Sequence, residues 1–347
     1  MRSVVGAVVF GLACVVTAGV LLAADAPPPW AYGFATPPPP AGTPAPAPAA
    51  PPPAAAPDTT LKHLPGSNLA FTLTQIRDAF GPADWYPGDH PQMPDVVAHG
   101  RRPDVRACSL CHYPNGKGRP ENAGVSGLPV SYFIQTMADF KNGARKSSDA
   151  RKANTNLMIA FAKAMTDDEV KAAAQYFGAI KWTPWIKVVE AKTVPKTRIA
   201  GGMFLVEGEE KEPIGQRIIE TPENTEATEM LRDARSGFIA YVPVGSLKKG
   251  EALVTSGGGG KTTQCAVCHG ADLQGLGPVP GIAGRSPSYL VRQLYDMQQG
   301  SRMGTWTDLM KPVVAKLSAD DMLAIAAYTA ARPVGATTNR GLTSAGR

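Results

Sequence analysis

The chain has 347 residues, a length typical of about two domains, and 44% of them are hydrophobic, which is enough for packed cores. Four of its five cysteines fall in two short motifs, and the fifth, Cys14, lies in an apolar amino-terminal stretch. No pair therefore remains for a structural disulfide, which excludes a disulfide-stapled fold. The formal net charge of +6 excludes no class of partner by itself.

The first 26 residues are predicted to direct export. An uncharged run from Val4 to Ala24 is long enough to cross a bilayer. Ala24-Asp25-Ala26 is a candidate cleavage site, but Pro27 directly after it disfavours cleavage. Both outcomes stay open, a signal peptide or an uncleaved membrane anchor, and either one exports the rest of the chain.

Residues 27–60 are predicted to be a Pro/Ala-rich linker. From Pro27 to Pro57 there are 14 prolines in 31 residues. This composition favours extended polyproline II over packed structure. The first folded region is expected to begin at Leu61.

Two pentapeptides have the spacing of covalent attachment sites for haem c: Cys108-Ser109-Leu110-Cys111-His112 and Cys265-Ala266-Val267-Cys268-His269. On one helical turn, residues at i, i+3 and i+4 project from the same side, so two thiols can bond one porphyrin while the histidine reaches its iron. A pair of zinc knuckles is the alternative, but such a site needs no histidine directly after its second cysteine. The motifs predict two haem c groups.

The two motifs belong to an internal repeat. An offset of 157 carries Gly124-Val125-Ser126-Gly127 onto Gly281-Ile282-Ala283-Gly284. The same offset pairs Tyr132 with Tyr289 and Arg145 with Arg302, and these arginines are candidates for contact with haem propionates. After them the first copy has five extra residues, and the offset becomes 152.

Helical periodicity recurs in both copies. Matching apolar positions at i, i+4 and i+7 predict one face of a middle helix in each copy, formed by Phe133, Met137 and Phe140 and by Leu290, Leu294 and Met297. Thr166 with Glu169, and Ser318 with Asp321, predict capping boxes at the start of each last helix.

Met158 and Met310 are the methionines that coincide between the copies. Each stands eight residues before a predicted helix cap, in an expected loop opposite the histidine. We predict that they are the axial thioether ligands, with His112 and His269 on the other side of each iron. A His/Met pair raises the reduction potential and leaves no open coordination position. For the second nitrogen of each histidine, the expected partner is a backbone carbonyl near Ala123 or Pro280.

Between the copies, short β-branched runs punctuated by glycine and proline predict a small β-containing insert at 183–245. The expected architecture is mainly α, with domain 1 at 61–182, domain 2 at 246–332 and a tail at 333–347.

The order of its motifs makes each copy resemble a class I cytochrome c. The second copy, from Lys248 to Ala331, fits closely, and the first copy, from Arg106 to Ile180, is longer before its expected methionine ligand. The pair is similar to dihaem class I cytochromes of bacterial periplasms and to haem subunits of membrane-linked dehydrogenases. The resemblance implies a non-enzymatic carrier of single electrons between a dehydrogenase or cytochrome complex and a terminal oxidase or other acceptor. It implies a periplasmic location, soluble or anchored, and no role in nucleic-acid binding.

Two alternatives stay open at this point. A dihaem peroxidase would need one iron with an open coordination position. An obligate electron-transfer subunit would work only inside a membrane dehydrogenase complex.

Overall fold

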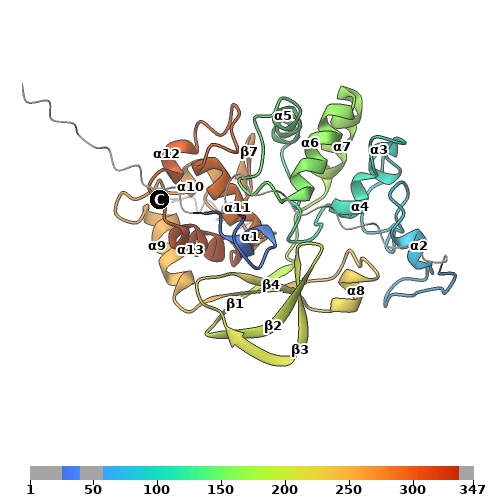
Figure 1. The fold of residues 1–347 in the computed structure, drawn as a ribbon. Coiled ribbons are helices and arrows are strands. Elements are labelled where there is room, and N and C mark those ends of the chain that lie inside the picture. The colour runs from blue at the N-terminus through green and yellow to red at the C-terminus, as the bar shows by residue number, and fades with distance from the viewer. Residues whose placement is uncertain (1–25, 40–57, 336–347) are drawn as a thin grey trace, which may run out of the picture.

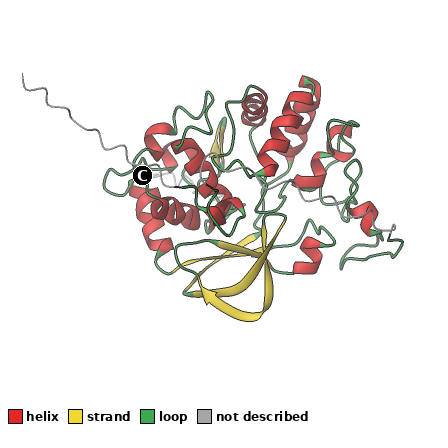
Figure 2. Ribbon diagram, in the orientation of Figure 1, coloured by secondary structure: helices red, strands yellow, loops and turns green. Residues whose placement is uncertain are grey.

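The computed structural model describes residues 26–39 and 58–335. Helices account for 35% and strands for 15% of the structure, so the mainly α expectation is correct (Figure 2). Three parts are named here: the first unit (61–182), the insert (183–245) and the second unit (246–332). Figure 1 shows the two units side by side, with the strands of the insert beneath them.

The first unit packs short helices around the first motif. Its helices are α2 (Leu73–Ile76), α3 (Asp95–Ala98), α4 (Cys108–His112), α5 (Val130–Lys141), α6 (Ala153–Ala164) and α7 (Asp167–Ala179). Val97, Met137 and Phe177 are among the buried residues of its core. The predicted apolar face of α5 turns inward, because burial of this stripe removes it from water.

The second unit packs its helices around the second motif. Its elements are α9 (Ser246–Ser256), α10 (Ala266–His269), β6 (Gly275–Leu276), β7 (Val279–Pro280), α11 (Pro287–Gln298), α12 (Lys311–Val314) and α13 (Ala319–Ala330). α9 packs closely on α13 because Gly250 has no side chain; a Cβ there would overlap the Ala324 carbonyl.

Both predicted capping boxes are confirmed. Thr166 accepts from the Glu169 amide at the start of α7, and Ser318 accepts from the Asp321 amide at the start of α13. In each box the acidic side chain also accepts from the backbone amide of the cap residue. The last helix of each unit therefore begins at the residue that the sequence indicates.

The insert contains two small sheets. Its elements are β1 (Ile186–Ala191), β2 (Thr193–Ala200), β3 (Met203–Pro213), β4 (Ile219–Pro222), α8 (Thr225–Glu229) and β5 (Phe238–Pro243). One sheet has the order β1-β5-β4, with β1 and β5 parallel and β4 antiparallel to β5. β2 and β3 pair as an antiparallel hairpin.

The linker prediction is wrong for its first residues. α1 (Pro29–Tyr32) lies against α11, and Trp30, Ala31 and Tyr32 are buried (Figure 1). Two aromatic side chains in this proline-rich stretch supply enough apolar surface to dock, which the proline count obscured. Residues 40–57 of the predicted linker lie outside the described residues.

The predicted export segment also lies outside the described residues. Within the described ranges, no helix has both the length and the apolar character needed to span a membrane.

Candidate functional site

The histidine of each motif is held by a backbone carbonyl eleven residues later. His112 Nδ1 lies 2.9 Å from the Ala123 carbonyl oxygen, and His269 Nδ1 lies 2.8 Å from that of Pro280. The expectation for these carbonyls is confirmed. Since a carbonyl only accepts, Nδ1 carries the proton and Nε2 is left as a lone-pair donor. Burial lowers the pKa of both imidazoles, which favours the neutral form that binds iron.

None of the four motif cysteines is paired in a disulfide. Burial raises the pKa of Cys108 to about 12 and that of Cys265 to about 11. Burial therefore favours the neutral thiol at both positions. The histidine directly after the second cysteine of each motif favours haem attachment over a metal-only site.

One cavity of about 720 Å³ connects the two motifs. Every predicted site residue lines it, namely Cys108, Cys111, His112, Met158, Cys265, Cys268, His269 and Met310. Its walls also hold apolar side chains of α5, α7 and α11, including Phe133, Phe177 and Leu294. A cavity that is lined mainly by apolar side chains and contains both motif histidines fits porphyrin groups.

The two methionines differ in their local structure. Met310 is the N-cap residue of α12, but Met158 lies inside α6, so the expectation of a ligand loop is wrong for the first unit. The sequence Ala153–Ala164 has no proline or glycine, which allows the five extra residues of this copy to continue as a helix. Met137, Met165 and Met297 line the same cavity.

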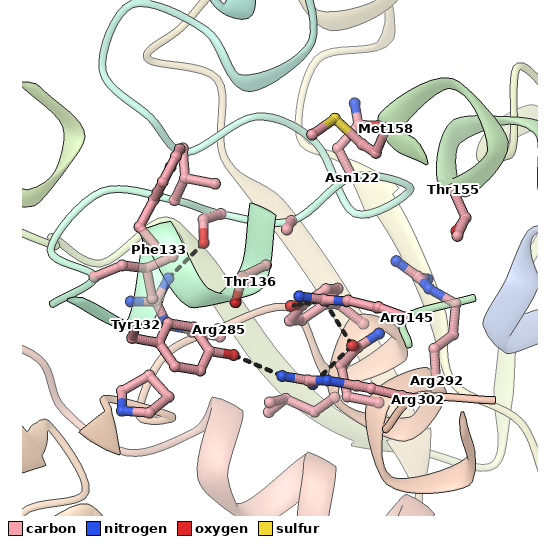
Figure 3. Close-up of a pocket in the computed structure, with 18 of the residues that line it drawn as sticks. Asn122, Tyr132, Phe133, Thr136, Arg145, Thr155, Met158, Arg285, Arg292 and Arg302 are labelled. Carbon is pink, nitrogen blue, oxygen red and sulfur yellow. Dashed lines mark hydrogen bonds between the residues drawn. The ribbon is translucent and has the colours of Figure 1, made fainter. Parts of the chain in front are cut away.

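Four arginines meet where the two units touch (Figure 3). Arg145, Arg285, Arg292 and Arg302 all line the cavity, and each is at most 8% exposed. Buried guanidinium groups need anionic or carbonyl partners, so this centre suits the carboxylates of haem propionates.

The contacts of this centre follow the repeat. Arg302 donates to the Tyr132 hydroxyl (2.7 Å) and Arg145 to the Tyr289 hydroxyl (3.3 Å), while both donate to the Gln293 side-chain oxygen (Figure 3). Each arginine thus reaches the tyrosine of the other unit, as expected for a self-complementary interface between repeated units.

The backbone reinforces this pairing. Lys146 donates its amide to Ser301 (2.7 Å) and Met303 donates to Ala144 (2.6 Å), which joins the two Gly-x-Arg loops as a short antiparallel bridge. Burial alone would raise the pKa of Tyr132, but Arg302 and Arg145 outweigh it and lower this pKa to about 8.

Sequence reasoning missed Arg285 and Arg292. Arg285 donates to the carbonyls of Gly124, Ser126 and Gly281, and Arg292 donates to those of Ala31 and Pro120. At an offset of 157 their counterparts are Leu128 and Gln135. The repeat comparison therefore gave no signal, because these residues join the units and have no repeated role.

No protein-family model matches the chain. The thiosulfate dehydrogenase electron acceptor of Stutzerimonas stutzeri is 25% identical over 235 residues, which cover 67% of this chain and 81% of that protein. Cytochrome c-554(548) of Halomonas halodenitrificans is 41% identical over 69 residues, 20% of this chain and 83% of that protein. The crystal structure of reduced cytochrome c4 from Pseudomonas stutzeri has a TM-score of 0.42 at 18% identity, covering 65% of this chain and 93% of that one.

The motifs, the carbonyl-held histidines and the two relatives found by sequence define a protein that carries covalently bound haem c and transfers electrons to and from redox partner proteins. The chain belongs to the class I cytochromes c. Its relatives are electron-transfer cytochromes and not enzymes, so the peroxidase alternative gains no support.

Proposed function

We propose that the protein carries two haem c groups and relays single electrons between them. Cys108, Cys111 and His112 would hold the first group, and Cys265, Cys268 and His269 the second. The observation that carries this proposal is the cavity that both motifs share and that the cluster of four arginines also lines. When bound, each haem supplies a one-electron change of its iron.

The protein's own side chains would fix the position and environment of each haem. The Ala123 and Pro280 carbonyls orient the histidine rings, and the interface arginines hold the propionates. We assign Met158 and Met310 as the second axial ligands, since both line the cavity and match in the repeat. Domain boundaries at 61–182 and 246–332, separated by the insert, follow from this assignment.

The ligand assignment is tested on haem-loaded full-length protein. Mass measurement should show two added haem groups. Met158→Ala and Met310→Ala should each remove the low-spin His/Met signal of one haem and lower the reduction potential of that haem. Met137→Ala is the control, because Met137 lines the cavity but is not a proposed ligand. Unchanged spectra in both alanine variants, or a single added haem, would refute the proposal.

We propose that the electron donor is a dehydrogenase acting on thiosulfate or a related sulfur compound. The support is a relative named as a thiosulfate dehydrogenase electron acceptor. The match covers 81% of that relative's length. A periplasmic location accords with this role, with the amino-terminal segment as a signal peptide or an anchor. Reduction of the oxidised protein by purified thiosulfate dehydrogenase and thiosulfate is the direct test; no reduction by the active dehydrogenase would exclude this donor.

The second motif is the proposed entry point for electrons. Val267, inside this motif, is 65% exposed, and Leu276 and Leu309 are 60% and 62% exposed. Leu110, which matches Val267, is only half-exposed, and Arg119, which matches Leu276, is largely buried beside Glu121. Apolar side chains at an exposed haem edge favour short-lived contact with another redox protein.

A further inference from the structure

The insert closes the edge of the first haem site. Leu231 accepts from the Trp85 indole (2.7 Å), and Arg235 donates twice to Asp89 (2.7 Å each). The segment between these anchors places Arg232 in the wall of the cavity. The second motif has no such cover, since Cys268 and Val267 are both exposed.

Arg232 is fixed in place by its surroundings. Its backbone has φ +55°, a conformation that non-glycine residues seldom adopt. Its guanidinium lies 5.3 Å from the ring centre of Tyr113, the residue directly after His112. Asn115 also donates to the Ala234 carbonyl, so the insert is anchored to the first unit on both sides of this arginine.

The charges near the two motifs differ. Beside the first motif, Arg119 lies 2.7 Å from Glu121, and Glu229 is paired with Arg198 at 2.9 Å, so these charges largely offset one another. Arg232 and Arg106 add positive charge to this end of the cavity. At the second motif, the positions that match Arg106, Arg119 and Glu121 are Thr263, Leu276 and Pro278, which carry no charge.

We propose that Arg232 holds the first haem at a higher reduction potential than the second. Reduction removes one unit of positive charge from a haem, so a fixed cation beside it stabilises the reduced state. Exclusion of solvent by the insert acts in the same direction, because a buried site disfavours the more highly charged oxidised form. An electron that enters at the exposed second motif would then transfer to the first haem, where the reduced state is more stable. This inference rests on the proposed two-haem function.

The test is a redox titration of the haem-loaded full-length protein. Optical spectra and proton NMR of the haem methyl groups monitor the oxidation state during the titration. Contacts to Phe133 and Phe177 identify the first haem, because Leu290 and Thr329 stand at the matching positions of the second unit. In the wild type, the first haem should be reduced before the second.

Arg232→Gln should reduce the equilibrium constant for reduction of the first haem about tenfold, which is ~59 mV for one electron. Arg232→Lys should retain most of the potential. Arg217→Gln is the control: Arg217 belongs to the insert and pairs with Glu212, but it does not line the cavity. This variant should leave the reduction potentials of both haems unchanged.

Three results would overturn the proposal: reduction of the second haem first in the wild type, an unchanged first haem in Arg232→Gln, or equal shifts of both haems. If Arg232→Gln does not fold, reduction of the second haem first in the wild type would still overturn the proposal. Failure of the two-haem function itself is recognised separately, as a wild type without two reversible one-electron waves.

Discussion

At the scale of single residues, the candidate site is built from contacts between residues close in sequence, and these contacts occur in both copies of the repeat. Each motif histidine meets a carbonyl eleven residues later, and the positions of these carbonyls could be predicted because glycine-rich loops of equal length follow both motifs. The proposed assignment of Met158 and Met310 as axial ligands depends on the same comparison of the two copies. Residues with a repeated local task are therefore visible in the sequence.

Asp321 does more than complete the capping box of α13. It accepts from Ser318 and forms ion pairs with Lys249 and Lys261, while its own side chain is 1% exposed. We expect Asp321→Asn to lower the free energy of unfolding by about 1–3 kcal/mol, because hydrogen bonds to a buried carboxylate are lost or weakened. Chemical denaturation measures this change.

The effect of this substitution should depend on pH. Burial alone would raise the pKa of Asp321, but hydrogen bonds from Lys261, Lys249 and Ser318 outweigh it and lower this pKa. The stabilisation is therefore fully present above the unfolded pKa of about 3.9 and is lost as the pH falls through the lower folded value. Glu169→Gln, in the matching box with the exposed Arg101 as partner, should cost less, about 0–1 kcal/mol. Equal costs at pH 7 would contradict this account.

At the scale of elements, α1 shows how a short segment can stabilise the junction of the units. Tyr32 donates to Asp296 of α11 (2.7 Å), and the same carboxylate oxygen accepts from the Ser148 amide of the first unit. We expect Tyr32→Phe to lower the free energy of unfolding by about 1.5–3 kcal/mol, since the buried carboxylate loses a donor. Tyr328→Phe, whose hydroxyl only accepts a 3.4 Å contact from Arg332, is the control and should have little effect in the same denaturation experiment. A Tyr32→Phe variant as stable as wild type would show that α1 stabilises by apolar contact alone.

The exposed edge of the second motif is the element expected to meet partners. Val267→Asp should slow electron exchange with a reduced monohaem cytochrome about tenfold, a change equivalent to about 1.4 kcal/mol, because a charge replaces an apolar side chain in the contact. Stopped-flow absorbance measures the rate. Val244→Asp is the matched control, since Val244 is 62% exposed but lies at the end of the insert, outside the second motif. Equal slowing in both variants would place the contact elsewhere.

Across the whole molecule, the sequence predicted what is repeated and missed what joins the repeats. The last helices, their caps and the face of α5 follow from periodicity and capping chemistry, which act over a few residues. Two features depend instead on distant partners: the docking of Trp30 and Tyr32, and the contacts of Arg292 with both α1 and the Pro120 carbonyl. Such partners become neighbours only after the chain has folded, so no local pattern indicates them.

Arg285 provides the strongest test of how the two units are joined. The residue is 5% exposed, and its guanidinium donates to Gly281 of its own unit (2.7 Å) and to Gly124 and Ser126 of the first unit (2.7 and 3.2 Å). It also lies 4.2 Å from the ring centre of Trp182. Arg285→Met keeps much of the apolar stem but leaves three carbonyls without this donor, so we expect a loss of about 2–4 kcal/mol.

Arg285→Met should weaken the interface between the units and leave the core of each unit intact. Thermal unfolding of the haem-loaded variant, followed at the haem absorption band and by calorimetry, should separate into two transitions where the wild type has one, because cooperativity between units depends on the contacts that join them. Arg332→Met removes an arginine that lies over Tyr328 within the second unit and should retain a single transition. If Arg285→Met also unfolds in one step at the wild-type temperature, the reciprocal Arg145 and Arg302 contacts are sufficient to couple the units without it.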